Sequence, residues 1–136
     1  ELADLARHAA ECNEPFWTDR FSAAETLDLL ARWYLSRMKG SPVEKLPRRN
    51  VLGPSRMPLA VPTARKLETD ALIRVARGID LAVEYTGMLP SRIRCGEGPV
   101  GTSGEIGTGT ALAALGEALS AGEPRGSVPA RTVSSL

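Results

Sequence analysis

Three closely spaced glycines are the first residues of this sequence whose pattern could support chemistry. Gly96, Gly98 and Gly101 match G-x-G-x-x-G, which binds the phosphates of a dinucleotide when a buried strand precedes it and a helix opens from it. The preceding residues here are SRIRC, in which two arginines interrupt the apolar side chains, and Pro99 removes a backbone N–H from the pattern itself. We therefore predict a surface loop or irregular hairpin, not a nucleotide site.

Other residues suited to catalysis or metal binding are few and far apart. His8 is the only histidine, and Cys12 and Cys95 form no C-x-x-C pair, so the sequence indicates no zinc site and leaves a single disulfide open. The acidic residues are expected on solvated helix surfaces, without a paired-carboxylate arrangement. We therefore assign no catalytic residue, no metal and no cofactor, and we expect the chain not to be an enzyme.

The composition is that of an ordinary globular chain. Hydrophobic residues make up 43% and charged residues 24% of the 136 residues, which suits one modest domain or two small helical units with a packed core. Seventeen Lys and Arg balance sixteen Asp and Glu, so bulk charge gives no reason to expect nucleic acid as a partner. No apolar run approaches the ~18 residues of a membrane-spanning helix.

Apolar residues spaced three and four apart predict a mainly α fold, a small helical repeat module of about four helices with a short extended or hairpin element. Ser22 and Glu25 form a capping box at the start of the second helix, and Gly87 is expected to end the third. The predicted helices are 1–12, a helix from Ser22 to about Met38, Asp70–Tyr85 and a helix capped by Thr108 or Thr110; the extended element lies near Arg92–Cys95.

The second helix is apolar on two faces. Leu29 and Trp33 project away from a first apolar stripe, whose members are Leu27, Leu30, Ala31, Tyr34 and Met38. Two faces need two partners, and the second can be a neighbouring repeat, another domain or a ligand. We predict that Trp33 is buried between units, since an exposed Trp beside Leu29 would leave an apolar patch.

A proline-rich stretch, VLGPSRMPLAVPTAR, divides the chain near residue 60, because closely spaced prolines favour an extended connector over a helix. The predicted organisation is a partly degenerate first helical unit with its connector at 1–60 and a second helical unit at 61–122. Residues 123–136 lack usable periodicity and are predicted to form a flexible tail.

The two units contain a degenerate repeat of a helix followed by a short arm. In the helices, Glu25, Leu27, Ala31, Arg32 and Met38 correspond at one constant offset to Asp70, Leu72, Ala76, Arg77 and Val83. In the arms, after a two-residue contraction, Leu46, Pro47, Arg49 and Gly53 correspond to Leu89, Pro90, Arg92 and Gly96. Such a repeat indicates units that bury their faces by stacking on one another.

With this repeat the chain resembles the pseudomurein-binding repeat family, cell-wall-associated modules found beside wall-acting enzymes and surface proteins. The second unit is the more similar: LIRVARGIDLAVEYTG as the apolar helix, MLPSRIRCGEGPVG as the glycine, Leu-Pro and strand-like segment, and ALAALGEAL as the closing helix. The family's closing helix usually carries aromatic residues nearby, whereas alanines and leucines follow Thr110 here. The loop at 97–109 is also expanded.

The resemblance implies noncatalytic attachment to a cell-wall polymer or another glycan, and an extracellular or cell-envelope location. Sugar recognition needs aromatic faces for apolar C–H surfaces and polar groups for hydroxyls. The residues that could supply them are the aromatics Trp17, Trp33 and Tyr85 and the polar residues Arg77, Glu84 and Arg92.

A protein-interaction or spacer domain of a multidomain polypeptide is the alternative function. Its docking surface would be the second apolar face of the second helix, at Leu29 and Trp33. The sequence starts with Glu1 and has no signal-peptide pattern, so it is interpreted as an excised or truncated segment of a larger protein. A neighbouring domain of that protein is therefore a second candidate partner.

Overall fold

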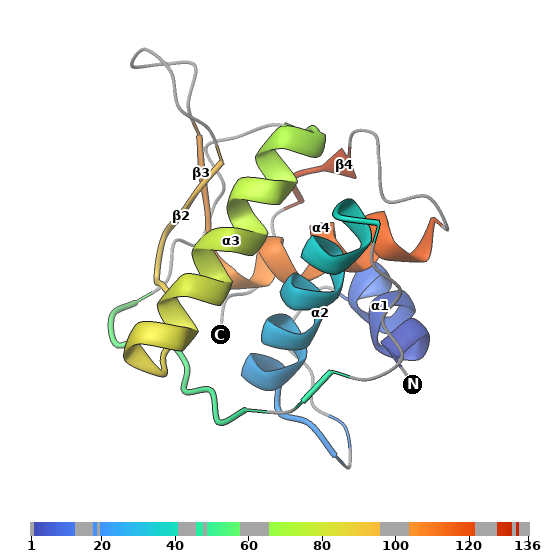
Figure 1. Cartoon of the computed structure of the whole chain (residues 1–136). Helices are drawn as coiled ribbons and strands as arrows, with labels where there is room; N and C mark the ends of the chain where they lie inside the picture. Colours follow the sequence, from blue (N-terminus) through green and yellow to red (C-terminus); the bar gives the residue numbers. More distant parts are fainter. Residues whose placement is uncertain are drawn as a thin grey trace.

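The computed structural model describes residues 2–12, 18, 20–40, 46–47, 49–57, 66–95, 104–121, 128–131 and 133. Four helices dominate this part of the chain, which confirms the predicted mainly α fold (Figure 1). The helices are α1 (Leu2–Glu11), α2 (Ala23–Met38), α3 (Thr69–Thr86) and α4 (Thr108–Ser120). The glycine pattern at 96–101 and the prolines at 58 and 62 lie outside the described residues.

The boundaries of α2 and α3 follow from local sequence signals. At the start of α2, the Ser22 hydroxyl accepts from the Glu25 amide and the Glu25 carboxylate accepts from the Ser22 amide, both at 3.1 Å, so the predicted capping box is confirmed. At the end of α3, Gly87 has φ 74° and its amide donates to the Val83 carbonyl. A glycine suits this position because a left-handed backbone has no Cβ clash there.

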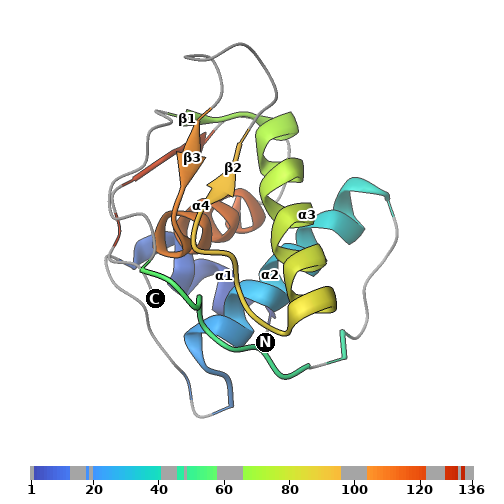
Figure 2. The same cartoon turned by 90° about the vertical axis from the view of Figure 1, so that its left-hand side faces the viewer.

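One hydrophobic core joins all four helices. In the two perpendicular views, α2 packs beside α3, and α4 crosses behind both and carries α1 on its far side (Figures 1 and 2). Both apolar faces of α2 are therefore used inside the chain: Leu27 and Leu30 are fully buried, and Leu29 is 3% exposed. Helices from either side of the predicted division near residue 60 thus share the same core.

Helix α4 is the central helix of this core. Nearly every residue from Thr108 to Leu119 is buried, which means that other elements surround the helix on all sides. Its alanines and glycines have small side chains, so these elements can approach it closely. A Cβ added at Gly116 would lie 2.5 Å from Ala9 Cβ and 2.6 Å from the Ala6 carbonyl oxygen, which shows how closely α1 packs on it. The predicted threonine cap is wrong, because the N-cap is Gly107 and Thr108 is the first helical residue.

Two small antiparallel strand pairs complete the fold. β2 (Ile93–Arg94) pairs with β3 (Glu105–Ile106), which confirms the predicted extended element, and β1 (Lys66–Leu67) pairs with β4 (Val128–Pro129). An isolated parallel bridge joins Leu52 to Met88.

Residues 128–131 and 133, which belong to the tail predicted to be flexible, make contacts with the rest of the fold. Val128 pairs with Leu67 in the β1–β4 ladder, and Val133 is 1% exposed. The Thr110 hydroxyl donates to the Arg131 carbonyl at 2.6 Å, and the Arg131 guanidinium donates to the Ala10 carbonyl at 2.7 Å. Residues 128–131 are held by a strand pair and polar contacts, not by the apolar face of a helix, so their sequence needs no helical spacing of apolar residues.

Among the described residues, none of the helices is both long and apolar enough to span a bilayer.

Candidate functional site

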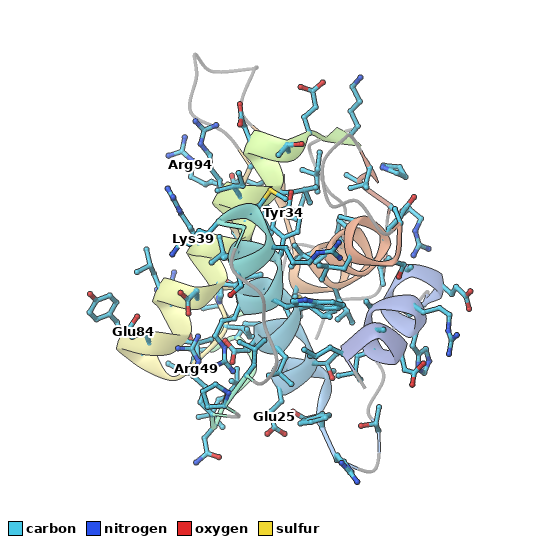
Figure 3. The ribbon with its side chains drawn as sticks, turned by 45° about the vertical axis from the view of Figure 1, so that its right-hand side comes forward. Glu25, Tyr34, Lys39, Arg49, Glu84 and Arg94 are labelled. Carbon is cyan, nitrogen blue, oxygen red and sulfur yellow. The ribbon has the colours of Figure 1, made fainter. Side chains whose placement is uncertain are left out.

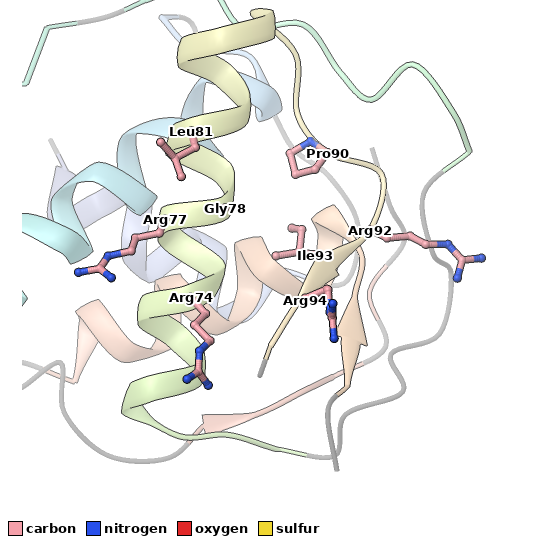
Figure 4. A pocket seen from close by; sticks show the side chains of 8 residues that line it. All are labelled: Arg74, Arg77, Gly78, Leu81, Pro90, Arg92, Ile93 and Arg94. Carbon is pink, nitrogen blue, oxygen red and sulfur yellow. The ribbon is translucent and has the colours of Figure 1, made fainter. Parts of the chain in front are cut away.

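An open groove lies between α3 and β2 (Figure 4). Its volume is about 510 Å³. Four arginines and four small or apolar residues line it: Arg74, Arg77, Arg92 and Arg94, with Gly78, Leu81, Pro90 and Ile93. The groove thus combines an apolar surface with a high local density of positive charge.

Helical spacing and strand pairing together build the groove. Residues 74, 77, 78 and 81 are three or four apart and therefore share one face of α3. Ile93 is held on the other side by its pairing with Ile106 and is 2% exposed. Gly78 adds no side chain between them: a Cβ there would lie 3.9 Å from Ile93 Cγ2. The floor is consequently apolar, and the guanidinium groups lie at the rims.

Three of the four groove arginines form no ion pair or side-chain hydrogen bond with any described residue, namely Arg74, Arg77 and Arg94. Arg92 lies 4.0 Å from the Glu105 carboxylate, and their side chains are 62% and 39% exposed. Figure 4 shows Arg74 and Arg94 extending in the same direction from opposite walls, whereas Arg77 and Arg92 point to opposite sides. The positive charge of the groove is therefore largely uncompensated within the described residues.

An exposed apolar strip continues the groove along α3. Leu81 is 50% exposed, and Tyr85, one turn further along the same face, is 79% exposed. A second hollow, of about 400 Å³, adjoins the groove at Pro90 and Arg92 and is also lined by Arg56. The arginine groove and the Tyr85 strip together form a surface that extends beyond a single small pocket.

Two partly buried arginines form an ion cluster around the buried Asp28. Arg49 Nη2 lies 2.6 Å from the Asp28 carboxylate and 2.6 Å from that of Asp80, and Arg49 Nε also donates to Asp28. Arg32 donates to the second Asp28 oxygen at 2.8 Å. The hydrogen bond to Asp28 is the largest cause that raises the pKa of Arg49. This cluster fastens the arm after α2 to α2 and α3, as the position of Arg49 in Figure 3 illustrates.

The candidate binding residues predicted from the sequence fall into separate places. Arg77 and Arg92 line the groove and Tyr85 extends it. Glu84 is exposed at the C-terminal end of α3, outside the groove lining and away from Arg94 (Figure 3). The structure thus brings together three of the six predicted binding residues, namely Arg77, Arg92 and Tyr85.

Trp33 lies on a different part of the molecule from the groove. Its half-buried ring packs against the core, and the Arg37 guanidinium carbon stands 5.7 Å from the ring centroid. Arg37 also donates to the Leu119 carbonyl of α4, so this face of α2 is turned towards α4. The alternative docking face at Leu29 and Trp33 is therefore covered largely from within the chain. Trp17 lies outside the described residues.

Sequence reasoning did not single out Arg74, Arg94 or the Asp28 cluster. Arg74 could have been found from its three-residue spacing to Arg77, and Arg94 from its two-residue spacing to Arg92, which places both on one side of a strand. Asp28 gave no usable signal, because a carboxylate within a mostly apolar stretch of helix reveals neither its burial nor its distant partners.

The two cysteines are free thiols. Cys95, which follows β2, is 5% exposed, and burial followed by the charge of Glu105 raises its pKa to about 11. Burial also raises the pKa of Cys12. Neither thiol therefore has the lowered pKa of a reactive cysteine. Within the described ranges, no group of three or more His, Cys, Asp or Glu side chains is placed to hold a metal ion.

Comparison of the chain with protein-family models, with curated proteins and with solved structures found no match in any of the three. The resemblance to pseudomurein-binding repeats thus stays a prediction from the sequence.

Proposed function

We propose that this chain is a noncatalytic module that attaches its parent protein to cell-wall or related polysaccharide through the α3–β2 groove. The observation that carries the proposal is an open, apolar-floored groove continued by the exposed ring of Tyr85. Pyranose rings present apolar C–H faces that stack on aromatic and aliphatic side chains, while their hydroxyls accept from donors such as guanidinium groups.

The chemistry of the lining favours binding over catalysis. Guanidinium groups remain protonated at neutral pH and cannot act as a general base. The remaining lining residues are glycine, leucine, proline and isoleucine, which contribute no nucleophile or acid. The open groove also suits a polymer, because a chain longer than the site must extend beyond it at both ends.

Sedimentation with insoluble cell-wall polysaccharides tests the proposal. The chain is expected to co-sediment, and Tyr85→Ala is expected to weaken binding by about tenfold or more, as is typical of an aromatic contact residue. Arg7→Ala on α1 is the control, because Arg7 is an exposed arginine on a different helix, paired only with the neighbouring Asp4 in the described residues. Absence of binding to every polysaccharide tested, by a chain with an intact thermal transition, would overturn the proposal.

A further inference from the structure

We infer that the α3–β2 groove binds an acidic polysaccharide, with a carboxylate or phosphate group of the polymer held between Arg74 and Arg94. This inference rests on the proposed function and specifies its ligand class. It starts from the excess of charge: four arginines line the groove, and Glu105, at 4.0 Å from Arg92, is the acidic residue that pairs with one of them among the described residues.

The repeat shows that this excess is particular to the second unit. Arg77 and Arg92 correspond to Arg32 and Arg49, which share the Asp28 carboxylate in the first unit. At the offset that aligns the two helices, the position of Asp28 is occupied by Ile73. The second unit has therefore kept both arginines without a counterpart of Asp28, the carboxylate that accepts from both of them in the first.

Neutral sugars do not require such an arrangement. Several guanidinium groups within one groove repel one another, and an anion relieves that repulsion while accepting charge-assisted hydrogen bonds. The planar fork of arginine matches a carboxylate or a phosphate in particular. Arg74 and Arg94 line the groove from its two walls and extend in the same direction (Figure 4).

The rest of the surface favours a polysaccharide over a nucleic acid. The net charge of the chain is +1, whereas nucleic-acid binding typically needs an extended basic surface that neutralises many phosphates. The apolar floor and the exposed strip at Leu81 and Tyr85 offer contact area for sugar rings next to the charged sites.

Two matched polymer pairs test the inference. The first pair is polygalacturonate and its methyl ester, which differ in the carboxylate charge; the second is phosphomannan and the same mannan after removal of phosphate. The chain is expected to bind the charged member of at least one pair about tenfold or more tightly than the uncharged member, with an affinity that falls as salt rises. The pair that responds identifies the anion.

Variants connect the preference to the groove. The double variant Arg74→Ala with Arg94→Ala should abolish the preference for the charged polymer while leaving residual binding to the uncharged one through Tyr85. The double lysine variant at the same positions should retain part of the preference, since it keeps the charge but loses the fork. Arg7→Ala should bind like the unaltered chain.

Equal binding within both pairs would overturn the inference and leave the proposed function standing. Failure to bind any polysaccharide, including insoluble wall material, would remove both. Tighter binding to single-stranded DNA or RNA than to polygalacturonate and phosphomannan, lost in the double alanine variant, would overturn the assignment of a polysaccharide in favour of nucleic acid.

Discussion

Two pairs of arginines, at positions that correspond in the repeat predicted from the sequence, have opposite surroundings. In the first unit, Arg32 and Arg49 both donate to Asp28, whose side chain is 1% exposed. In the second unit, Arg77 has no ion-pair partner among the described residues and Arg92 meets Glu105 only at 4.0 Å. The same residue type at equivalent places therefore stabilises the fold in one unit and remains available to a ligand in the other.

The two surroundings differ in whether a buried carboxylate lies within hydrogen-bonding distance of the arginines. The buried Asp28 carboxylate accepts from both arginines, although Arg32 Nε has no hydrogen-bond partner among the described residues. Removing the carboxylate leaves charges that are costly to desolvate. An exposed arginine does not need a carboxylate partner to be stable, because water solvates its charge. Substitutions should consequently affect the stability of the first unit and the binding of the second.

Removal of the buried carboxylate should give the largest effect. Asp28→Asn removes the charge that Arg32 and Arg49 share, and the free energy of unfolding is expected to fall by about 3 kcal/mol. Chemical denaturation measures it, with Asp4→Asn as the control, since the pair of Asp4 with Arg7 is exposed on both sides. A loss below about 1 kcal/mol in Asp28→Asn would show that the cluster is not a main support of the arm.

The next effect concerns Cys95, which is buried directly after β2. Because burial raises its pKa from 9.0 to about 11, the folded chain holds the thiol proton more tightly than the unfolded chain does. Its contribution to stability is complete below pH 9.0 and is lost as the pH rises towards about 11. That contribution is expected to be roughly 2 kcal/mol.

Denaturation curves at several alkaline pH values, compared with those of Cys95→Ala, isolate this contribution. The variant is expected to lose less stability than the unaltered chain over the same interval. Parallel pH dependences in the two proteins would contradict a buried, neutral thiol at this position.

A smaller and stabilising effect is expected at Gly78 in the floor of the groove. Gly78 lies inside α3, and an alanine Cβ would make ordinary contact with Ile93 Cγ2 at 3.9 Å. Gly78→Ala should raise the free energy of unfolding by about 0.5–1 kcal/mol, because alanine is the better helix former. Thermal unfolding measures the gain, and a decrease in stability would show that the groove floor cannot accept a methyl group.

The smallest change in stability is expected for the exposed arginines of the groove. Arg77→Ala and Arg92→Ala should each change the free energy of unfolding by no more than about 0.5 kcal/mol, in contrast to their repeat counterparts. Arg49→Ala provides the direct comparison, since it breaks contacts with two carboxylates. Similar losses at Arg49 and Arg92 would remove the distinction between the two units.

The sequence alone determined the elements of this fold and part of its candidate site. Apolar spacing, the Ser22 capping box and Gly87 locate α2 and α3, because these signals act within a few residues of one another. The predicted repeat also includes Arg77 in its helix and Arg92 in its Leu-Pro arm, and both residues line one groove.

Only the tertiary structure decided which charges are neutralised. Asp28 and Arg49 meet across two elements, and Arg131 reaches Ala10 from the opposite end of the chain; neither contact has a local sequence signal. The order of residues 128–131 depends on β1 and α4 for the same reason. Helix starts and stops are local events, whereas burial and ion pairing depend on which distant segments the core brings together.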